Sequence, residues 1–161
     1  MRVSILSIIV SMFPVGLAQA AGPTESPQAE LERQFQEKLT NAVLVGRYTS
    51  GDGGQSNEDR YTISSARRLF GDNWIIVARI HYGQKDVTVP VPVTVKWAGD
   101  TPMIQLTDAA LPGLGTFTTR VLIYGEQYAG TWSGAGRGGH LWGRIERLAP
   151  APATQPGKGE E

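Results

Sequence analysis

The spacing of apolar residues changes once along this chain, from a helical period to an alternating one. Leu31, Phe35 and Leu39 recur every four residues among charged and polar neighbours, which is typical of an amphipathic helix. Ser26 and Pro27 supply the capping hydroxyl and the first-turn proline that begin such a helix. The sequence therefore predicts a helix that ends near residue 40 and packs its narrow apolar stripe on the end or flank of its own domain.

From residue 42 onward apolar and polar residues alternate, and glycine-rich turn signals follow one another at short intervals. Connections this short favour antiparallel neighbours, because a parallel crossover needs a dozen residues or more. We expect an all-β domain over residues 42–148, with about eight strands in an antiparallel meander that closes into a barrel. A two-sheet β-sandwich is the alternative. The expected strands cover residues 42–49, 58–69, 73–82, 86–97, 102–109, 114–124, 127–133 and 139–148.

The fourth expected strand contains two prolines, Pro90 and Pro92, between valines that must face the core. Because the prolines are two residues apart, both direct their backbone toward the same neighbouring strand, and neither has an N–H to donate. The sequence therefore predicts an edge, a bulge or a seam along that side. The barrel is expected to be interrupted at this strand, and a barrel that is open there is one form of that interruption.

The third expected strand is apolar on both faces over residues 74–78. One face can enter the core, and the other needs a cover. The N-terminal helix is one candidate for that cover, and a second copy of the chain or a protein partner is another. The Pro90/Pro92 edge is a second place where a partner could add a strand.

The first twenty residues have the pattern of a secretory signal peptide. Arg2 forms the positive n-region, residues 3–17 the apolar h-region, and Ala18-Gln19-Ala20 the cleavage site. We expect cleavage near Ala20 and an extracytoplasmic protein, periplasmic or secreted, with no membrane span in the mature chain. Residues 21–41 would form a polar lead and the helix. Residues 149–161, rich in Pro, Ala and Gly, predict a disordered tail.

Composition argues against several classes of function. The chain has 15 Lys+Arg and 15 Asp+Glu, so it lacks the excess of basic residues with which nucleic-acid-binding proteins attract phosphates. It has no cysteine and no Gly-x-Ser-x-Gly motif, and its two histidines lack metal-ligand spacing. The oxygen-rich segment 51–59 lacks the alternating pattern of a calcium loop and is expected to be a hairpin loop. The sequence predicts no enzyme, no metal and no cofactor.

Aromatic residues near the chain ends are the best candidates for a site. Tyr48, Trp132 and Trp142 each lie one or two residues from a glycine, on the first, seventh and eighth expected strands. Since the first and last strands of a closed barrel are neighbours, we expect these rings to cluster, either as a structural plug or as a ligand-stacking wall. The candidate ligand-binding residues are Tyr48, Trp74, Trp97, Trp132 and Trp142, with His140 as a polar contact.

A few short features carry a family resemblance: the N-terminal helix, Gly46-x-Tyr48, Gly130-x-Trp132, and Arg144 or Arg147 near the last strand. With these the chain resembles the calycin group, the lipocalin-like and avidin-like barrels, in which a Gly-x-Trp on the first strand packs under a late arginine. Uncharacterised exported bacterial proteins are similar over most of residues 40–147, on the strength of the glycine-rich ending and the run Val93-x-Val95-Lys96-Trp97-Ala98-Gly99-Asp100-Thr101-Pro102. A barrel of this kind is expected to bind a small apolar or amphipathic ligand in its mouth, without catalysis. The alternative is a structural or protein-interaction domain with a filled barrel.

Overall fold

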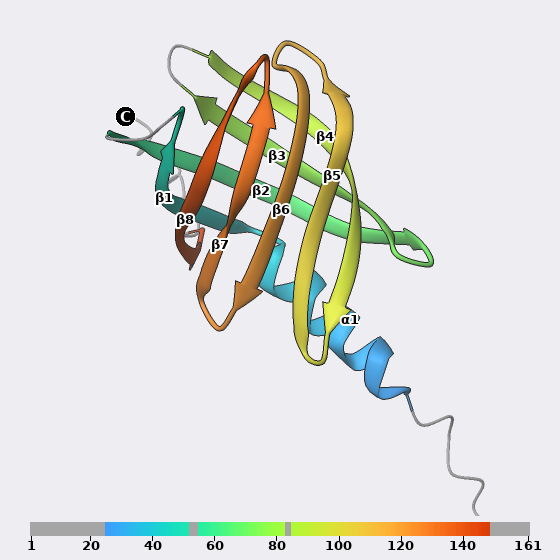
Figure 1. Ribbon diagram of the computed structural model, residues 1–161. Coiled ribbons are helices and arrows are strands. Elements are labelled where there is room, and N and C mark those ends of the chain that lie inside the picture. Colours follow the sequence, from blue (N-terminus) through green and yellow to red (C-terminus); the bar gives the residue numbers. More distant parts are fainter. Residues whose placement is uncertain (1–24, 52–54, 83–84, 149–161) are drawn as a thin grey trace, which may run out of the picture.

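The computed structural model describes residues 25–51, 55–82 and 85–148. The predicted signal peptide and the predicted disordered tail lie outside these residues. One helix and eight strands make up the described chain (Figure 1): α1 (Pro27–Leu39), β1 (Ala42–Thr49), β2 (Ser56–Phe70), β3 (Asn73–Tyr82), β4 (Lys85–Ala98), β5 (Thr101–Leu111), β6 (Gly115–Tyr124), β7 (Gln127–Gly134) and β8 (Arg137–Arg147).

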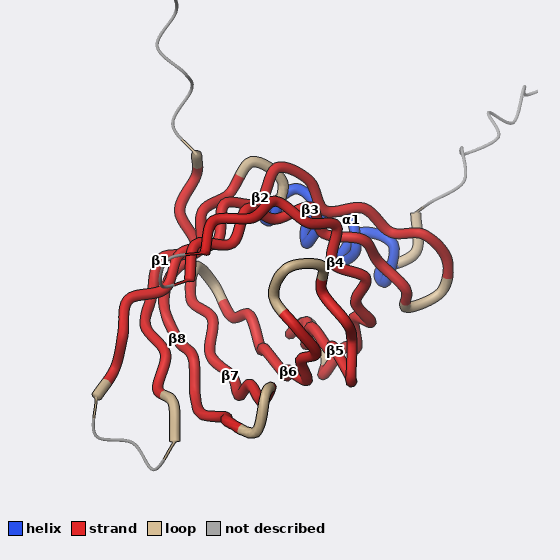
Figure 2. Tube along the Cα trace, turned by 90° about the horizontal axis from the view of Figure 1, so that it is seen from above, coloured by secondary structure: helices blue, strands red, loops and turns tan. Residues whose placement is uncertain are grey.

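The eight strands form a closed antiparallel barrel in which each strand pairs with its neighbours in sequence, and β8 pairs with β1. Figure 2 shows the strands arranged around one central space, with α1 near β2, β3 and β4. The predicted eight-stranded barrel with one helix is therefore confirmed, and the two-sheet sandwich does not form. Register is continuous along β1, where Ala42 pairs with Arg147 and Tyr48 with Leu141.

The barrel wall is incompletely paired at the two prolines. β4 pairs with β5 only from Thr94 to Ala98, although it pairs with β3 from Lys85 to Thr94. The Val95 N–H donates to the Asp72 carbonyl at 2.8 Å, on the β3 side of β4. Because N–H direction alternates along a strand, Pro90 and Pro92 face β5. The donors that proline removes are those that the missing β4–β5 pairs would need, so the predicted seam is confirmed within a barrel that still closes.

Helix α1 closes one end of the barrel. Its buried side chains are Phe35 and Leu39, and the Phe35 ring packs edge-on against Trp74 and Trp97, with centroids 5.1 and 6.0 Å apart. Lys38 donates to the Gly125 carbonyl at 2.7 Å, in the turn between β6 and β7. No helix among the described residues is long and apolar enough to span a bilayer.

Polar contacts hold both ends of α1 in place. The Ser26 hydroxyl accepts from the Ala29 N–H at 3.1 Å, as the predicted N-cap requires. At the other end, Arg147 of β8 donates to the carbonyls of Glu37 and Thr40 at 2.7 and 3.2 Å. The carbonyls at the end of a helix have no N–H partners within the helix, so Arg147 supplies donors that they would otherwise lack.

The helix does not cover the outer face of β3, which was one of the two expectations for that strand. Trp74, Ile76 and Ala78 face the interior, while Ile75 and Val77 point outward and are half-buried. The helix contacts β2 and β1 and inserts Phe35 among interior rings, because the open barrel end offers its stripe more apolar surface than a flank does. The alternative cover, a second copy or a partner, is left as a hypothesis.

Candidate ligand-binding cavity

The interior of the barrel contains a cavity of about 210 Å³ above the helix-closed end. The cavity is lined almost entirely by apolar and aromatic side chains from all eight strands and the β5–β6 turn: Leu44, Tyr48, Tyr61, Ile63, Ile76, Ala78, Ile80, Val91, Val93, Ile104, Leu106, Leu111, Leu114, Phe117, Thr119, Val121, Tyr128, Trp132 and Leu141.

The cavity reaches the incompletely paired part of the wall. Val91 of β4 and Leu106 and Leu111 of β5 line it from the two sides of the seam. The β5–β6 turn lies against β4 there, since a Cβ added at Gly113 would stand 3.7 Å from Val87 Cγ1. For a ligand to pass through the seam, this turn would have to move. No backbone pair between β4 and β5 would have to break, because the two strands pair only from Thr94 to Ala98.

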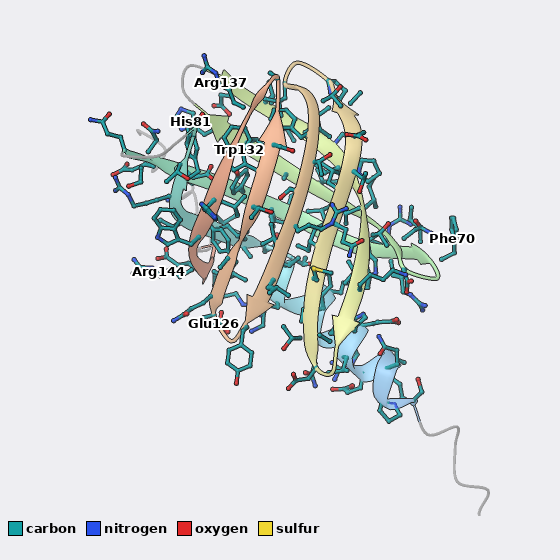
Figure 3. The ribbon with its side chains drawn as sticks, viewed as in Figure 1. Phe70, His81, Glu126, Trp132, Arg137 and Arg144 are labelled. Atoms are coloured by element: carbon teal, nitrogen blue, oxygen red, sulfur yellow. The ribbon has the colours of Figure 1, made fainter. Side chains whose placement is uncertain are left out.

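Two of the predicted aromatic residues, Tyr48 and Trp132, form part of the cavity wall. Their rings meet edge-on with centroids 6.0 Å apart, and the Phe117 ring lies 6.4 Å from Trp132 on the other side. The indole Nε1 of Trp132 donates to the Thr49 carbonyl at 2.9 Å, which ties the ring on β7 to the end of β1 across the intervening strand β8. Trp132 is labelled in Figure 3. Trp132 is thus both a lining residue and a structural tie.

The other predicted site residues lie away from the cavity. Trp74 and Trp97 pack around Phe35 at the closed end. Trp142 and His140 are exposed on the outer face of β8, and 40% of the Trp142 surface is accessible. The expected cluster of Tyr48, Trp132 and Trp142 is therefore wrong for Trp142. Leu141 and Ile145 place the odd-numbered residues of β8 inside, so alternation turns Trp142 outward.

Glycines on β1 and β8 accommodate a different ring, that of Tyr128 on β7. A Cβ added at Gly46 would lie 2.3 Å from the Tyr128 hydroxyl, and one at Gly143 would lie 2.8 Å from its ring. Tyr128 is 2% exposed, and its hydroxyl has no hydrogen-bond partner among the described residues. Gly46 and Gly143 were predicted to make room for Tyr48 and Trp142, but the ring that lies against them is that of Tyr128.

Asp59 is the second interior residue that sequence reasoning missed. It lies on the inner face of β2, in alternation with Tyr61 and Ile63, and pairs across the sheet with Gly46. It is 4% exposed and is the one buried charged residue of the described chain. Burial raises the pKa of its carboxyl from 3.8 to about 6, against the opposing influence of the Tyr61 hydroxyl and the Arg60 N–H. The even spacing of Asp59 from Tyr61 and Ile63 was the available signal.

Among the described residues no group of three or more His, Asp or Glu side chains is placed to hold a metal ion. No protein-family model, curated protein or solved structure matches this chain. The cavity and its lining residues are therefore the features that indicate what the site can bind. An apolar lining with a few convergent polar groups is the usual composition of a small-molecule site.

Proposed function

We propose that this protein binds a small, mostly apolar molecule inside its barrel and performs no catalysis on it. The observation that carries the proposal is the unfilled interior, since eight strands can give either a packed core or a ligand cavity. Protein interiors are normally packed without voids larger than a water molecule, so an empty space of this size leaves contacts unmade that a ligand would supply.

The size of the cavity indicates the size of the ligand. At about 210 Å³ it falls below the roughly 300–1,000 Å³ of sites for drug-sized molecules. A molecule with an unbranched chain of about eight carbons, or a single substituted aromatic ring, fits this space better than a long-chain lipid does. Burial of such a chain contributes roughly 0.8 kcal/mol for each methylene removed from water.

A paired substitution tests the proposal. Ala78 lines the cavity, whereas Ala129 is exposed on the outer face of β7. Ala78→Leu should abolish the binding of octan-1-ol in a calorimetric titration, because the added carbons occupy the cavity, while Ala129→Leu should bind as the wild type does. Equal affinity in all three proteins would refute a site inside the barrel. If none of the three binds, the filled-barrel interaction protein becomes the better account.

The seam favours ligand access over strand addition by a partner. A partner strand on the free side of β4 would meet Pro90 and Pro92, which have no N–H to donate. Prolines on an unpaired edge are a common protection against such pairing. The interaction hypothesis thus receives no support at this edge, and the half-buried outer face of β3 is its stronger location.

We also propose that the protein acts outside the cytoplasm, on the basis of residues 1–20 alone. Expression of the full chain and intact-mass measurement of the product provide the test. A chain that begins at Ala21 supports export, and a product that keeps its first twenty residues in the cytoplasmic fraction contradicts it.

A further inference from the structure

The inner wall carries a negative charge at one place. Asp59 reaches the interior from β2, and the side chain beside it on the same strand, Tyr61, lines the cavity. Tyr128 approaches from β7, with its hydroxyl over Gly46, the cross-strand partner of Asp59. A carboxyl and two phenols thus come together in a space otherwise surrounded by aliphatic and aromatic carbon. We call Asp59, Tyr61 and Tyr128 the acidic corner.

The acidic corner has hydrogen-bonding capacity that the protein does not use. The Tyr61 hydroxyl and the Arg60 N–H lie near enough to lower the pKa of Asp59, but neither carboxyl oxygen reaches full hydrogen-bonding geometry with a described donor. The Tyr128 hydroxyl likewise has no partner among the described residues. Buried polar groups of native proteins are rarely left in this condition, because each unsatisfied group costs its desolvation energy. Three such atoms beside an apolar cavity indicate that something other than the protein completes them.

No cation among the described residues influences the pKa of Asp59. Burial dominates its pKa, and the only opposing influences are the Tyr61 hydroxyl and the Arg60 N–H. The titratable groups that face the corner are phenols: Tyr61 interacts electrostatically with Asp59, Tyr128 and Tyr48. Since the pKa of Asp59 is about 6, most of the carboxyl is ionised at pH 7.5. At that pH the barrel interior holds a negative charge that no cation of the described segments balances.

We propose that the ligand carries a protonated amine at one end of its apolar body, and that the acidic corner binds this ammonium group. This inference rests on the proposed function. Asp59 is buried but is not one of the cavity-lining residues, so it would supply the countercharge, while the lining tyrosines, Tyr61 and Tyr128, would make the contact. A tyrosine hydroxyl can donate to the carboxylate and accept from the ammonium at the same time. The faces of the surrounding rings add cation–π attraction. A carboxylate ligand would be repelled here, and a neutral alcohol would leave the charge uncompensated.

Three probes of equal length separate the head group from the apolar chain: octylamine, octan-1-ol and octanoate. Calorimetric titration of the wild-type protein at pH 7.5 should give at least tenfold tighter binding for the amine than for the alcohol, with octanoate weakest. Asp59→Asn should weaken amine binding at least tenfold, to the level of the alcohol, and leave alcohol binding unchanged. Asp100→Asn, in the exposed β4–β5 turn, is the matched control and should bind all three probes as the wild type does.

The pH dependence gives a second readout that a merely structural role of Asp59 would not produce. Octylamine stays protonated between pH 5.0 and 7.5, while the ionised fraction of Asp59 falls from nearly all to about a tenth. Amine affinity should therefore fall about tenfold at pH 5.0 in the wild-type protein and stay constant in Asp59→Asn. Alcohol affinity should not change with pH in either protein.

The outcomes distinguish this inference from the function on which it rests. If the alcohol binds and Ala78→Leu abolishes that binding, but the amine binds no better, the acidic corner is not an ammonium site and the cavity is still a ligand site. Amine binding that survives Asp59→Asn at full strength overturns the inference in the same way. If no probe binds the wild-type protein, both proposals fail.

Discussion

Asp59→Asn should change how the stability of the ligand-free protein depends on pH. The carboxyl has a pKa of about 6 in the folded chain and an ordinary value of 3.8. The folded state therefore holds the proton more tightly than the unfolded state does, and protonation stabilises the fold. This contribution is complete below about pH 4 and is lost as the pH rises through 6. At about 1.4 kcal/mol for each pKa unit, the full loss is roughly 3 kcal/mol.

Part of that loss falls in an accessible pH range. Between pH 5.0 and 7.5 the wild-type protein should lose about 1.4 kcal/mol of unfolding free energy through Asp59, because one pKa unit of the shift lies above pH 5. Urea unfolding followed by far-ultraviolet circular dichroism, at both pH values, measures this difference. In Asp59→Asn the same difference should vanish. The absolute stability of the variant is less informative, because the new amide can itself stay unpaired at a cost of roughly 1–3 kcal/mol.

The matched control is again Asp100→Asn, whose side chain is exposed, and it should keep the wild-type pH dependence. If Asp59→Asn kept that dependence as well, the buried carboxyl would not be the group that titrates. The electrostatic basis of the acidic corner would then be wrong, whatever ligand the cavity holds.

Three further substitutions test the packing that surrounds the cavity. Phe35→Ala should destabilise the fold by about 3–5 kcal/mol in urea unfolding, since its ring fills the closed end; a loss under 1 kcal/mol would show that α1 does not seal the barrel. Gly46→Ala should displace the Tyr128 ring and alter the near-ultraviolet circular dichroism, and an unchanged spectrum would contradict the close approach of that hydroxyl. Trp132→Phe should remove the indole hydrogen bond at a cost of about 1 kcal/mol and weaken octan-1-ol binding, whereas a collapsed fold would assign the indole to a structural plug.

The architecture was largely predictable, because strand periodicity and turn residues are local signals. β1 and β3 begin and end at the predicted residues, and the other strands differ by a few residues at their ends. The seam was predictable for the same reason, since the missing N–H groups of Pro90 and Pro92 are a property of two residues. Closure of the barrel through Thr94–Ala98 needed the three-dimensional register, which no single strand contains.

The site was less predictable, because it depends on which face of each strand turns inward. Trp142 was assigned to the interior from its neighbouring glycine, although Leu141 and Ile145 in the same strand place it outside. Asp59 was assigned to an oxygen-rich loop from its composition, although it continues the inner face of β2. A buried carboxylate contradicts the usual preference of charged residues for solvent, so composition pointed away from the residue that distinguishes this cavity.

The structure gives different partners to the two late arginines named for the calycin resemblance, Arg144 and Arg147. Arg144 forms an ion pair with Glu146 of the same strand. Arg147 donates to the last turn of α1 at the closed end of the barrel and pairs across the sheet with Ala42 of β1. Tyr48 lies six residues after Ala42, at the other end of β1. At about 3.3 Å per residue the two are roughly 20 Å apart along the strand. Arg147 therefore fixes the helix that closes the barrel.

A crystal structure of the protein soaked with 8-bromooctan-1-amine tests the central claim most directly, because the anomalous signal of bromine locates the ligand without bias. We expect a chain inside the barrel, with the nitrogen within 3.2 Å of the Tyr61 or Tyr128 hydroxyl and the bromine among the aliphatic side chains. Bromine only on the outer surface, with the interior repacked around an empty or vanished cavity, would contradict the account.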